Sequence, residues 1–400
     1  EVDDIRLNWK ENSLDQNDRN QRISINGKRI RPFHLKLGTG WESSGSNNIY
    51  WIPITTYNVY DKIMFGTVLH NLSLPGKKFE FILAPQYSLA TKNLAGNATI
   101  QYFFPLKSTT NDYLKIGMQT RLYSFTANKI FDYTERYFKL QPYITYSFAT
   151  KPNTKISNKI TLQSTWLRFK EFQLSFDTFQ NFIGKSVTHS QRLVTEIYFE
   201  HANLNGVNPT KFKSSLQHFS YTYFNLQQRN RIRWINEIKT DIFYSCKHAI
   251  SLRGYAGLML YNSHEQEDNN GLVNYQEGVL SLFSNGVMDN LETLDGLFIG
   301  RNEEGGLASA QIIGDHNGGF KAAYTNSLTS GISNKYLVAA NIQADMPFSS
   351  KLFPIKAYLD AGYGPMAIAG AKETKFLWEF GAMLNYQDIF RIHIPIVYHD

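Results

Sequence analysis

Apolar and polar residues alternate in this sequence over long runs. In residues 112–125, DYLKIGMQTRLYSF, Lys115 and Arg121 belong to the polar row. The other row is apolar or neutral, and it consists of Leu114, Ile116, Met118, Thr120 and Leu122. Successive side chains of a strand point to opposite faces, so this run predicts a strand with one apolar face and one charged face.

The same alternation recurs along most of the chain, between short stretches rich in turn-forming residues. The clearest further examples are residues 137–148, 159–166, 231–242, 355–360 and 376–381. No amphipathic helix interrupts them, and no apolar run approaches the ~18 residues that a membrane-spanning helix requires. The sequence therefore predicts an all-β fold of antiparallel strands.

The number and length of the runs decide between a soluble and a membrane protein. We expect about 12 to 16 strands, and a barrel of that size encloses water, so its apolar face must point outward. Many runs match the ~9 to 11 residues of a transmembrane strand, and aromatic residues gather near their ends. A soluble sandwich or propeller would bury the same alternation, but sandwich strands average about five or six residues and no repeat of about 40 residues occurs.

The prediction is a transmembrane antiparallel β-barrel in a bacterial outer membrane, with the lipid bilayer as its first partner. Two details stay open: whether residues 49–72 form one kinked strand or two, and whether residues 172–179 continue a spanning strand. An even strand number would place both ends of the barrel on the periplasmic side.

The two rows give two sets of candidate site residues. The predicted lipid-facing residues are Leu114, Ile116, Met118, Leu122, Leu140, Ile144, Phe148, Ile232, Trp234 and Ile238. The predicted lumen-lining residues are Lys115, Arg121, Lys139, Lys159, Arg233, Glu237, Lys239, Asp241, Arg253, Lys356, Asp360 and Glu379. The polar row could form a path for ions or solutes, or it could be a wall of cross-strand pairs of opposite charge.

Domain boundaries follow from composition. Residues 1–30 are polar, rich in Asn and Asp, and predict an N-terminal tether, whereas residues 31–400 predict the barrel. Residues 263–317 form a connection far longer than a hairpin loop, with apolar stretches inside it. Such a loop could fold into the lumen as a plug, with Arg301, Glu303 and Glu304 pairing with the wall, or it could cover the rim.

Several function classes find no support. Cys246 is the single cysteine, and the 41 Lys and Arg residues are scattered rather than gathered in a basic patch, so we expect no zinc site built on cysteines and no nucleic-acid partner. No G-x-S-x-G motif occurs. The string that begins at His264, HEQED, lacks the second histidine of the H-E-x-x-H zinc motif. We expect no catalytic residues, no metal ligands and no cofactor in this chain.

Particular stretches resemble a known family. They are RPFHLKLGTG (31–40), IYWIPITTYNVYDKIMFG (49–66), KKFEFILAPQYSLATKNLAGNATIQYFFP (77–105), FIGRNEEGG (298–306), DHNGGFK (315–321) and FRIHIPIVY (390–398). Together they resemble the C-terminal outer-membrane barrel of Bacteroidota proteins related to M1 (gluzincin) metallopeptidases. The resemblance implies an N-terminal zinc-peptidase-like region ahead of a membrane-embedded module, and it assigns no zinc ligand to this chain.

Two functions of different classes follow. The first is a membrane anchor or scaffold for a metallopeptidase-like protein or for another outer-membrane or periplasmic complex. The second is a porin or transporter whose positively biased lumen admits anionic solutes. An enzyme that uses residues of the barrel wall is a third interpretation, and no motif supports it.

Overall fold

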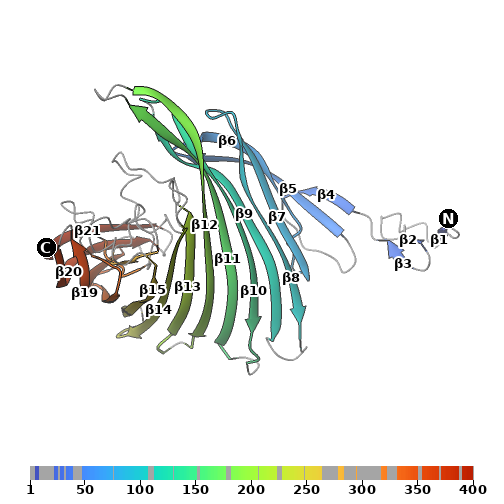
Figure 1. Ribbon diagram of the computed structural model, residues 1–400. Helices are drawn as coiled ribbons and strands as arrows, with labels where there is room; N and C mark the ends of the chain where they lie inside the picture. Colours follow the sequence, from blue (N-terminus) through green and yellow to red (C-terminus); the bar gives the residue numbers. More distant parts are fainter. Residues whose placement is uncertain are drawn as a thin grey trace.

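The computed structural model describes most of the chain. The described residues are 5–8, 22–25, 28–30, 33–38, 47–74, 76–106, 112–128, 130–150, 154–176, 182–205, 207–222, 228–246, 248–263, 278–282, 294, 317–321, 331–349, 354–368, 371–386 and 390–399. Every regular element among them is a β-strand, which confirms the expected all-β class (Figure 1).

The strands vary widely in length, and the longest lie in the middle of the chain. They are β1 (Ile5–Asn8), β2 (Arg22–Ile25), β3 (Lys28–Ile30), β4 (Phe33–Leu37), β5 (Asn47–Asn58), β6 (Lys62–His70), β7 (Phe79–Ser88), β8 (Leu94–Pro105), β9 (Tyr113–Asn128), β10 (Tyr133–Ser147), β11 (Ile156–Phe176), β12 (Phe182–Asn203), β13 (Thr210–Thr222), β14 (Gln228–Phe243), β15 (Ala249–Asn262), β16 (Leu280–Ser281), β17 (Ile332–Ser333), β18 (Tyr336–Asp345), β19 (Ile355–Ile368), β20 (Ala371–Tyr386) and β21 (Phe390–His399).

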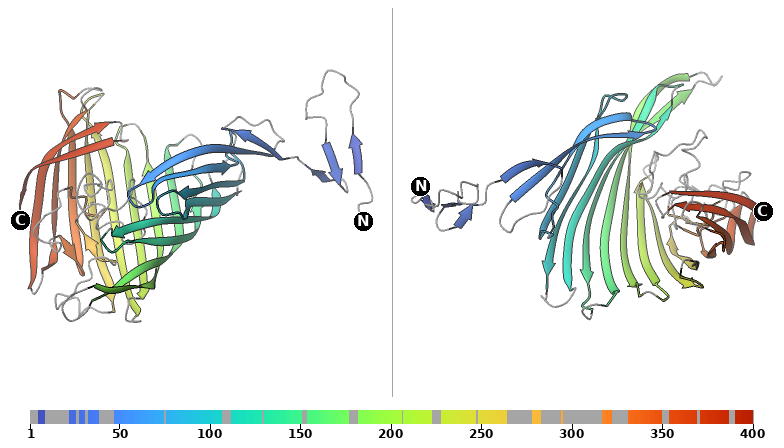
Figure 2. Two further views of the ribbon diagram at one scale, coloured as in Figure 1. Left: turned by 90° about the horizontal axis from the view of Figure 1, so that it is seen from above. Right: turned by 180° about the vertical axis from the view of Figure 1, so that it is seen from behind.

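A single sheet of 16 strands, β4 to β15 followed by β18 to β21, dominates the molecule, and the count lies at the upper limit of the expected range. Neighbours in sequence are neighbours in the sheet, and β15 pairs with β18 across the long loop. Residues 49–72 form two strands, β5 and β6, joined by a turn. The sheet curves strongly, and β4 and β21 are its two edges in the described part of the chain (Figure 2).

Three features differ from the sequence-based expectation. Strands β1 to β3 form a small antiparallel sheet of their own, which was not predicted, within the expected N-terminal tether. Strand β4 pairs with β5 in parallel, whereas all other described neighbours in the large sheet are antiparallel. With β4 set apart, β5 begins at one end of the sheet and β21 finishes at the opposite end, so the expected placement of both ends on one side is wrong.

The two ends of the sheet have different connections. At one end, which we call the long-loop end, lie the turns after β5, β7, β9, β11, β13 and β19 and the connection from β15 to β18. The opposite end, which we call the short-turn end because none of its connections exceeds nine residues, carries the others. Apart from the connection from β15 to β18, the turns at the long-loop end have two to five residues. Strands β11 and β12 have 21 and 22 residues and extend beyond their neighbours at the long-loop end (Figure 1).

The turn between β5 and β6 is fastened to distant strands by one buried carboxylate. Asp61 is fully buried, and its Oδ2 accepts hydrogen bonds from Asn58 Nδ2 at 3.0 Å and Ser124 N at 2.9 Å. Its Oδ1 accepts from Ser124 Oγ at 2.7 Å and Thr91 Oγ1 at 3.1 Å. Both carboxylate oxygens are therefore surrounded by donors from β9 and from the turn after β7.

We predict that Asp61→Asn destabilises the fold by about 2 kcal/mol, because the new amide NH₂ would face donors where the carboxylate oxygen accepts. Urea unfolding of the detergent-solubilised chain measures the change. The control Asp132→Asn makes the same substitution at an exposed turn residue with φ +47°, a conformation that asparagine tolerates, so stability should stay within about 0.5 kcal/mol. Equal effects at both positions would contradict the role of Asp61.

Candidate functional site

The two faces of the large sheet differ in chemistry. Register places Ile116 opposite Ile144 and Leu216 opposite Trp234 on one face. These side chains are exposed: Ile116 by 41%, Ile144 by 45% and Trp234 by 44%. We call this the outer face. All ten predicted lipid-facing residues belong to the same row as these residues, and among the described strands β9 to β15 the row carries no Asp, Glu, Lys or Arg between the short-turn end and Trp166.

The outer face forms an apolar band of defined height. On β10 it runs from Phe148, just past the strand, to Phe138, with Phe138 and Trp166 in edge-to-face contact at 5.9 Å. Ten residues of strand rise ~33 Å, and a tilt of ~40° reduces this to ~25 Å, which is the height of the apolar band of transmembrane barrels. Aromatic pairs also lie at the limit of the band nearest the short-turn end, such as Tyr102–Phe104 and Tyr146–Phe148.

The predicted lumen-lining residues all lie on the opposite face, which we call the inner face. Lys139, Arg233, Arg253, Asp360 and Glu379 are buried there. The remaining members are half-buried, and they are Lys115, Arg121, Lys159, Glu237, Lys239, Asp241 and Lys356. Burial of so many charged groups requires hydrogen-bond and ion-pair partners, because an unpaired charge away from water is costly. Their role in lining a lumen stays a prediction.

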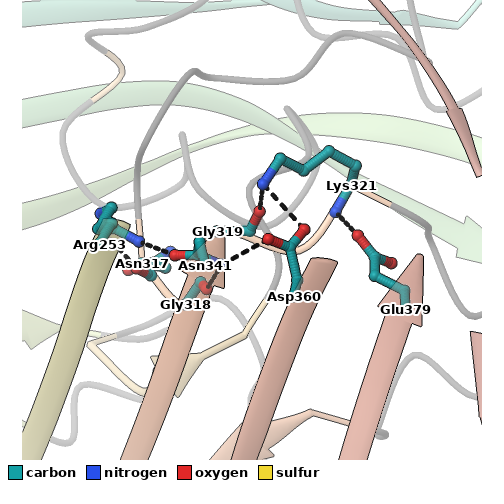
Figure 3. Close-up of polar contacts among 8 residues, drawn as sticks. All are labelled: Arg253, Asn317, Gly318, Gly319, Lys321, Asn341, Asp360 and Glu379. Atoms are coloured by element: carbon teal, nitrogen blue, oxygen red, sulfur yellow. Dashed lines mark hydrogen bonds and ion pairs between the residues drawn. The ribbon is translucent and has the colours of Figure 1, made fainter. Parts of the chain in front are cut away.

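One set of partners comes from the long loop. Lys321 Nζ forms an ion pair with Asp360 Oδ2 at 2.9 Å, and Lys321 N donates to Glu379 Oε1 at 2.5 Å (Figure 3). Lys321 Nζ also donates to the carbonyl oxygen of Gly319. A segment of the loop is thus held simultaneously by β19 and β20.

The same network continues across β18 to β15. Asn341 Nδ2 donates to Asp360 Oδ1 at 2.8 Å and to Gly318 O at 2.9 Å. Arg253 donates to Asn341 Oδ1 at 2.9 Å and to Asn317 O at 2.7 Å (Figure 3). Arg253 also pairs with Glu237 at 3.3 Å. We call the residues Arg253, Lys321, Asn341, Asp360 and Glu379 the loop latch.

A second network runs around the inner face below the loop. Gln141 donates to Gln163 at 3.0 Å, and both Gln163 and Gln217 donate to the Glu196 carboxylate, at 2.6 and 2.8 Å. Arg233 Nε donates to Gln217 at 2.6 Å, and Arg233 NH1 donates to the loop carbonyl of Val279 at 2.6 Å. This belt joins five adjacent strands, β10 to β14, and ends on the loop.

Apolar contacts hold the loop to the wall at two separate places. The first is a buried cluster of loop and strand residues, which comprises Ile235, Tyr255, Leu280, Leu282, Phe320, Leu337, Ala339 and Leu377. The second surrounds Leu294, which packs with Phe125, Leu167 and Phe169 and whose carbonyl oxygen accepts from Arg121 at 3.4 Å. The described parts of the loop therefore reach from β18–β20 to β9–β11 along the inner face.

Glycines make room for the loop. A Cβ on Gly257 would lie 2.6 Å from Leu280 Cδ2, and a Cβ on Gly362 would lie 2.5 Å from Leu282 Cδ2. Gly319 has φ +82°, and a Cβ there would lie 2.6 Å from Asn341 Oδ1. Each close approach places a small residue where the loop touches the sheet.

The sequence identified one half of this site. Arg253, Asp360 and Glu379 were expected on the inner face, and the structure brings all three to the latch. Lys321 and Asn341 were not identified, although Lys321 follows the adjacent glycines of DHNGGFK, a signal of close backbone approach. Arg301, Glu303 and Glu304, expected to hold the plug, lie outside the described residues, as does His264.

The described residues contain no cluster of three or more His, Cys, Asp or Glu side chains that could hold a metal ion. None of the described segments is a helix long and apolar enough to cross a bilayer. A sheet with an outer face free of charge through its apolar band, a polar inner face and a loop folded inside it defines the class of transmembrane β-barrel proteins, whose members lie in outer membranes.

Comparisons with known proteins place no family name on the chain: no family model and no curated protein matches it. Similar solved structures include CdiB from Escherichia coli (TM-score 0.41, 11% identity, 88% of this chain and 59% of that chain) and BamA from Haemophilus ducreyi lacking POTRA domains 1–3 (0.40, 11%, 90% and 71%). CdiB from Acinetobacter baumannii is also similar (0.37, 10%, 90% and 60%). The chain thus spans about three fifths of the two CdiB structures.

We predict that Gly362→Ala loosens the loop, because its methyl group would overlap Leu282, at a cost of about 1–3 kcal/mol. Limited proteolysis of the folded chain in detergent should then cleave within residues 263–331 faster than in the unmodified protein. The control Gly184→Ala adds the same methyl group in β12 where nothing lies within 4 Å. Unchanged cleavage in Gly362→Ala would show that Leu282 does not hold the loop.

Proposed function

We propose that this chain is the membrane-embedded module of an outer-membrane protein and that it serves as an anchor or scaffold rather than as an open channel. The observation that carries this proposal is the loop latch. The described loop residues 278–282 and 317–321 are buried against the inner face, apart from the half-buried Asn317, and Lys321 is fixed there by Asp360 and Glu379. A barrel whose interior is occupied by its own latched loop offers a rigid wall instead of a wide pore.

The connections support an orientation. Transmembrane barrels carry their longest loops on the extracellular side, and the connection from β15 to β18 is by far the longest between described strands of the large sheet, so the long-loop end would face the outside of the cell. Strand β5 begins at the short-turn end, which would then be periplasmic. Residues that precede the barrel would enter from the periplasm.

The resemblance in sequence suggests what the module anchors. On that resemblance, given by stretches such as IYWIPITTYNVYDKIMFG and DHNGGFK, we propose a metallopeptidase-like region or another periplasmic or outer-membrane protein as partner. The peptidase chemistry would belong to that region, since the motif H-E-x-x-H does not occur in this chain. A search of the coding sequence upstream for H-E-x-x-H tests this choice of partner.

A porin or transporter is the second candidate, and one observation favours it. Lys115 and Lys159 are half-buried on the inner faces of β9 and β11, in strands that the loop latch does not contact. A positive inner surface of this kind would suit anionic solutes. Conductance in planar bilayers separates this candidate from the plugged anchor.

We predict that Ile116→Arg hinders insertion into bilayers, because a charge facing lipid near the middle of the membrane costs about 2–4 kcal/mol. Folding into phosphatidylcholine vesicles, followed by heat-modifiable gel mobility, measures the folded fraction. Gln119→Arg is the matched control on the same strand, since Gln119 belongs to the inner row. Equal folding of the two variants would refute a lipid-facing outer surface.

We predict that the unmodified chain conducts little in planar bilayers and that Lys321→Ala increases the open fraction. Removal of the Lys321 ammonium leaves Asp360 buried without its ion-pair partner, which destabilises the latched state by about 3–5 kcal/mol. Lys335→Ala removes an exposed lysine near the same end and should leave the current unchanged. Large steady currents from the unmodified chain would favour the porin instead.

A further inference from the structure

The outer face of β11 changes from apolar to basic at one height. Ile160 and Leu162 lie in the outer row, and Trp166 closes the apolar part of that row. The next two residues of the same row toward the long-loop end are Arg168 and Lys170, and both are exposed. Charge therefore appears on this face immediately beyond the aromatic boundary.

Strand β12 shows the same change. Leu193 and Ile197 are exposed in its outer row, opposite Trp166 and Leu162. Beyond Leu193 the row includes Gln191, His189 and Lys185. His189 is paired with Lys170, and Lys185 is paired with Leu174. We call Arg168 and Lys170 the basic rim.

The height of the basic rim matches the lipid headgroups. Outer-row residues follow one another at ~7 Å along a strand, so Arg168 and Lys170 lie ~7 and ~13 Å beyond Trp166, or ~5 and ~10 Å along the membrane normal after tilt. The headgroup layer occupies about 5–8 Å on each side of the hydrocarbon. Arg168 falls within that layer, and Lys170 lies ~2 Å beyond its outer limit.

No carboxylate of the described residues forms an ion pair with the basic rim. Glu171 lies on the inner row, Glu135 accepts from Phe172 N at 2.9 Å, and Asp61 is buried within the β5–β6 turn. Lys185 Nζ donates to the main-chain oxygens of Phe131, at 3.1 Å, and Asp132. None of the ion pairs among the described residues includes Arg168, Lys170 or Lys185.

The lysines are held near each other by an aromatic ring. Lys170 Nζ and Lys185 Nζ each lie 5.9 Å from the centre of the Phe172 ring, and Trp166 Nε1 donates to Gln191 at 3.4 Å. At the short-turn end the outer rows of the same two strands finish on uncharged residues and a histidine, including Asn158, which is paired with His201. The basic surface is therefore confined to one side of the membrane.

We propose that the basic rim binds the phosphate groups of anionic lipids in the leaflet at the long-loop end. A phosphate group carries the negative charge that pairs with these cations, and the neighbouring apolar band contacts the acyl chains of the same lipid molecule. The occupant is thus a phosphorylated lipid, with its headgroup at Arg168 and Lys170 and its chains along Trp166 and Leu162. This inference rests on the proposed membrane placement, which the comparison of Ile116→Arg with Gln119→Arg tests separately.

The test uses the full chain folded in a non-ionic detergent. Native mass spectrometry counts bound phosphatidic acid, with diacylglycerol of the same acyl chains as the phosphate-free probe. We expect Arg168→Gln/Lys170→Gln to weaken phosphatidic acid binding about 30-fold, since each cation at a membrane surface contributes about a fivefold change in affinity. Lys155→Gln/Lys211→Gln removes the same charge from exposed lysines at the short-turn end and should leave binding unchanged.

Three results would overturn the proposal: equal phosphatidic acid binding by the rim variant and the unmodified chain, equal binding of diacylglycerol, or displacement by inorganic phosphate at the same concentration as by phosphatidic acid. The last result would indicate a site for free anions. Heat-modifiable gel mobility verifies folding of each variant. Should the double variant fail to fold, Arg168→Gln alone, at the exposed rim position nearest Trp166, should weaken binding about fivefold, and unchanged binding would count against the proposal.

Discussion

Hydrocarbon offers no hydrogen-bond partner to a peptide group and no solvation to a charge, and this single constraint organises the proposed membrane module. Strands can cross such a medium only when they pair with one another in a sheet, and the 16 strands pair in sequence order. The outer row must be free of charge through the apolar band, as it is from Phe148 to Phe138 on β10 and from Ile160 to Trp166 on β11. Charges return to that row at Arg168, where headgroups would replace hydrocarbon.

Exclusion of charge from one face concentrates it on the other. Strands alternate with a period of two, so each Lys, Arg, Asp or Glu within the band has to point inward. Sixteen strands enclose more space than their own side chains can fill, and the inner charges would then meet water or another part of the chain. In the structure, some inner polar groups bind neighbouring side chains in the belt centred on Glu196. Others bind loop atoms at Val279 and Lys321.

The sequence predicts the features that depend on local interactions. It misses those that depend on contacts between residues far apart in the chain. Alternation is local, so the rows containing Ile116 and Lys115 can be assigned to opposite faces from fourteen residues of sequence. The ion pair between Lys321 and Asp360 joins residues 39 positions apart, through a loop without periodicity, and no local pattern reveals it. The parallel pairing of β4 was missed for a related reason, since a strand of five residues alternates too briefly to show its partner or direction.

The apolar contacts and the loop latch have different effects on the loop. The apolar contacts keep it inside the wall, and the latch fixes its position. Contacts such as Leu282 against Gly362 and Leu280 against Gly257 stabilise a loop inside the wall, but hydrophobic attraction has no preferred direction. A buried ion pair adds little net stability, because desolvation of both charges offsets their attraction. Displacement of Lys321 by one residue, however, would leave Asp360 unpaired and would remove its main-chain bond to Glu379. The apolar cluster therefore keeps the loop inside, and the latch determines the one position in which it rests.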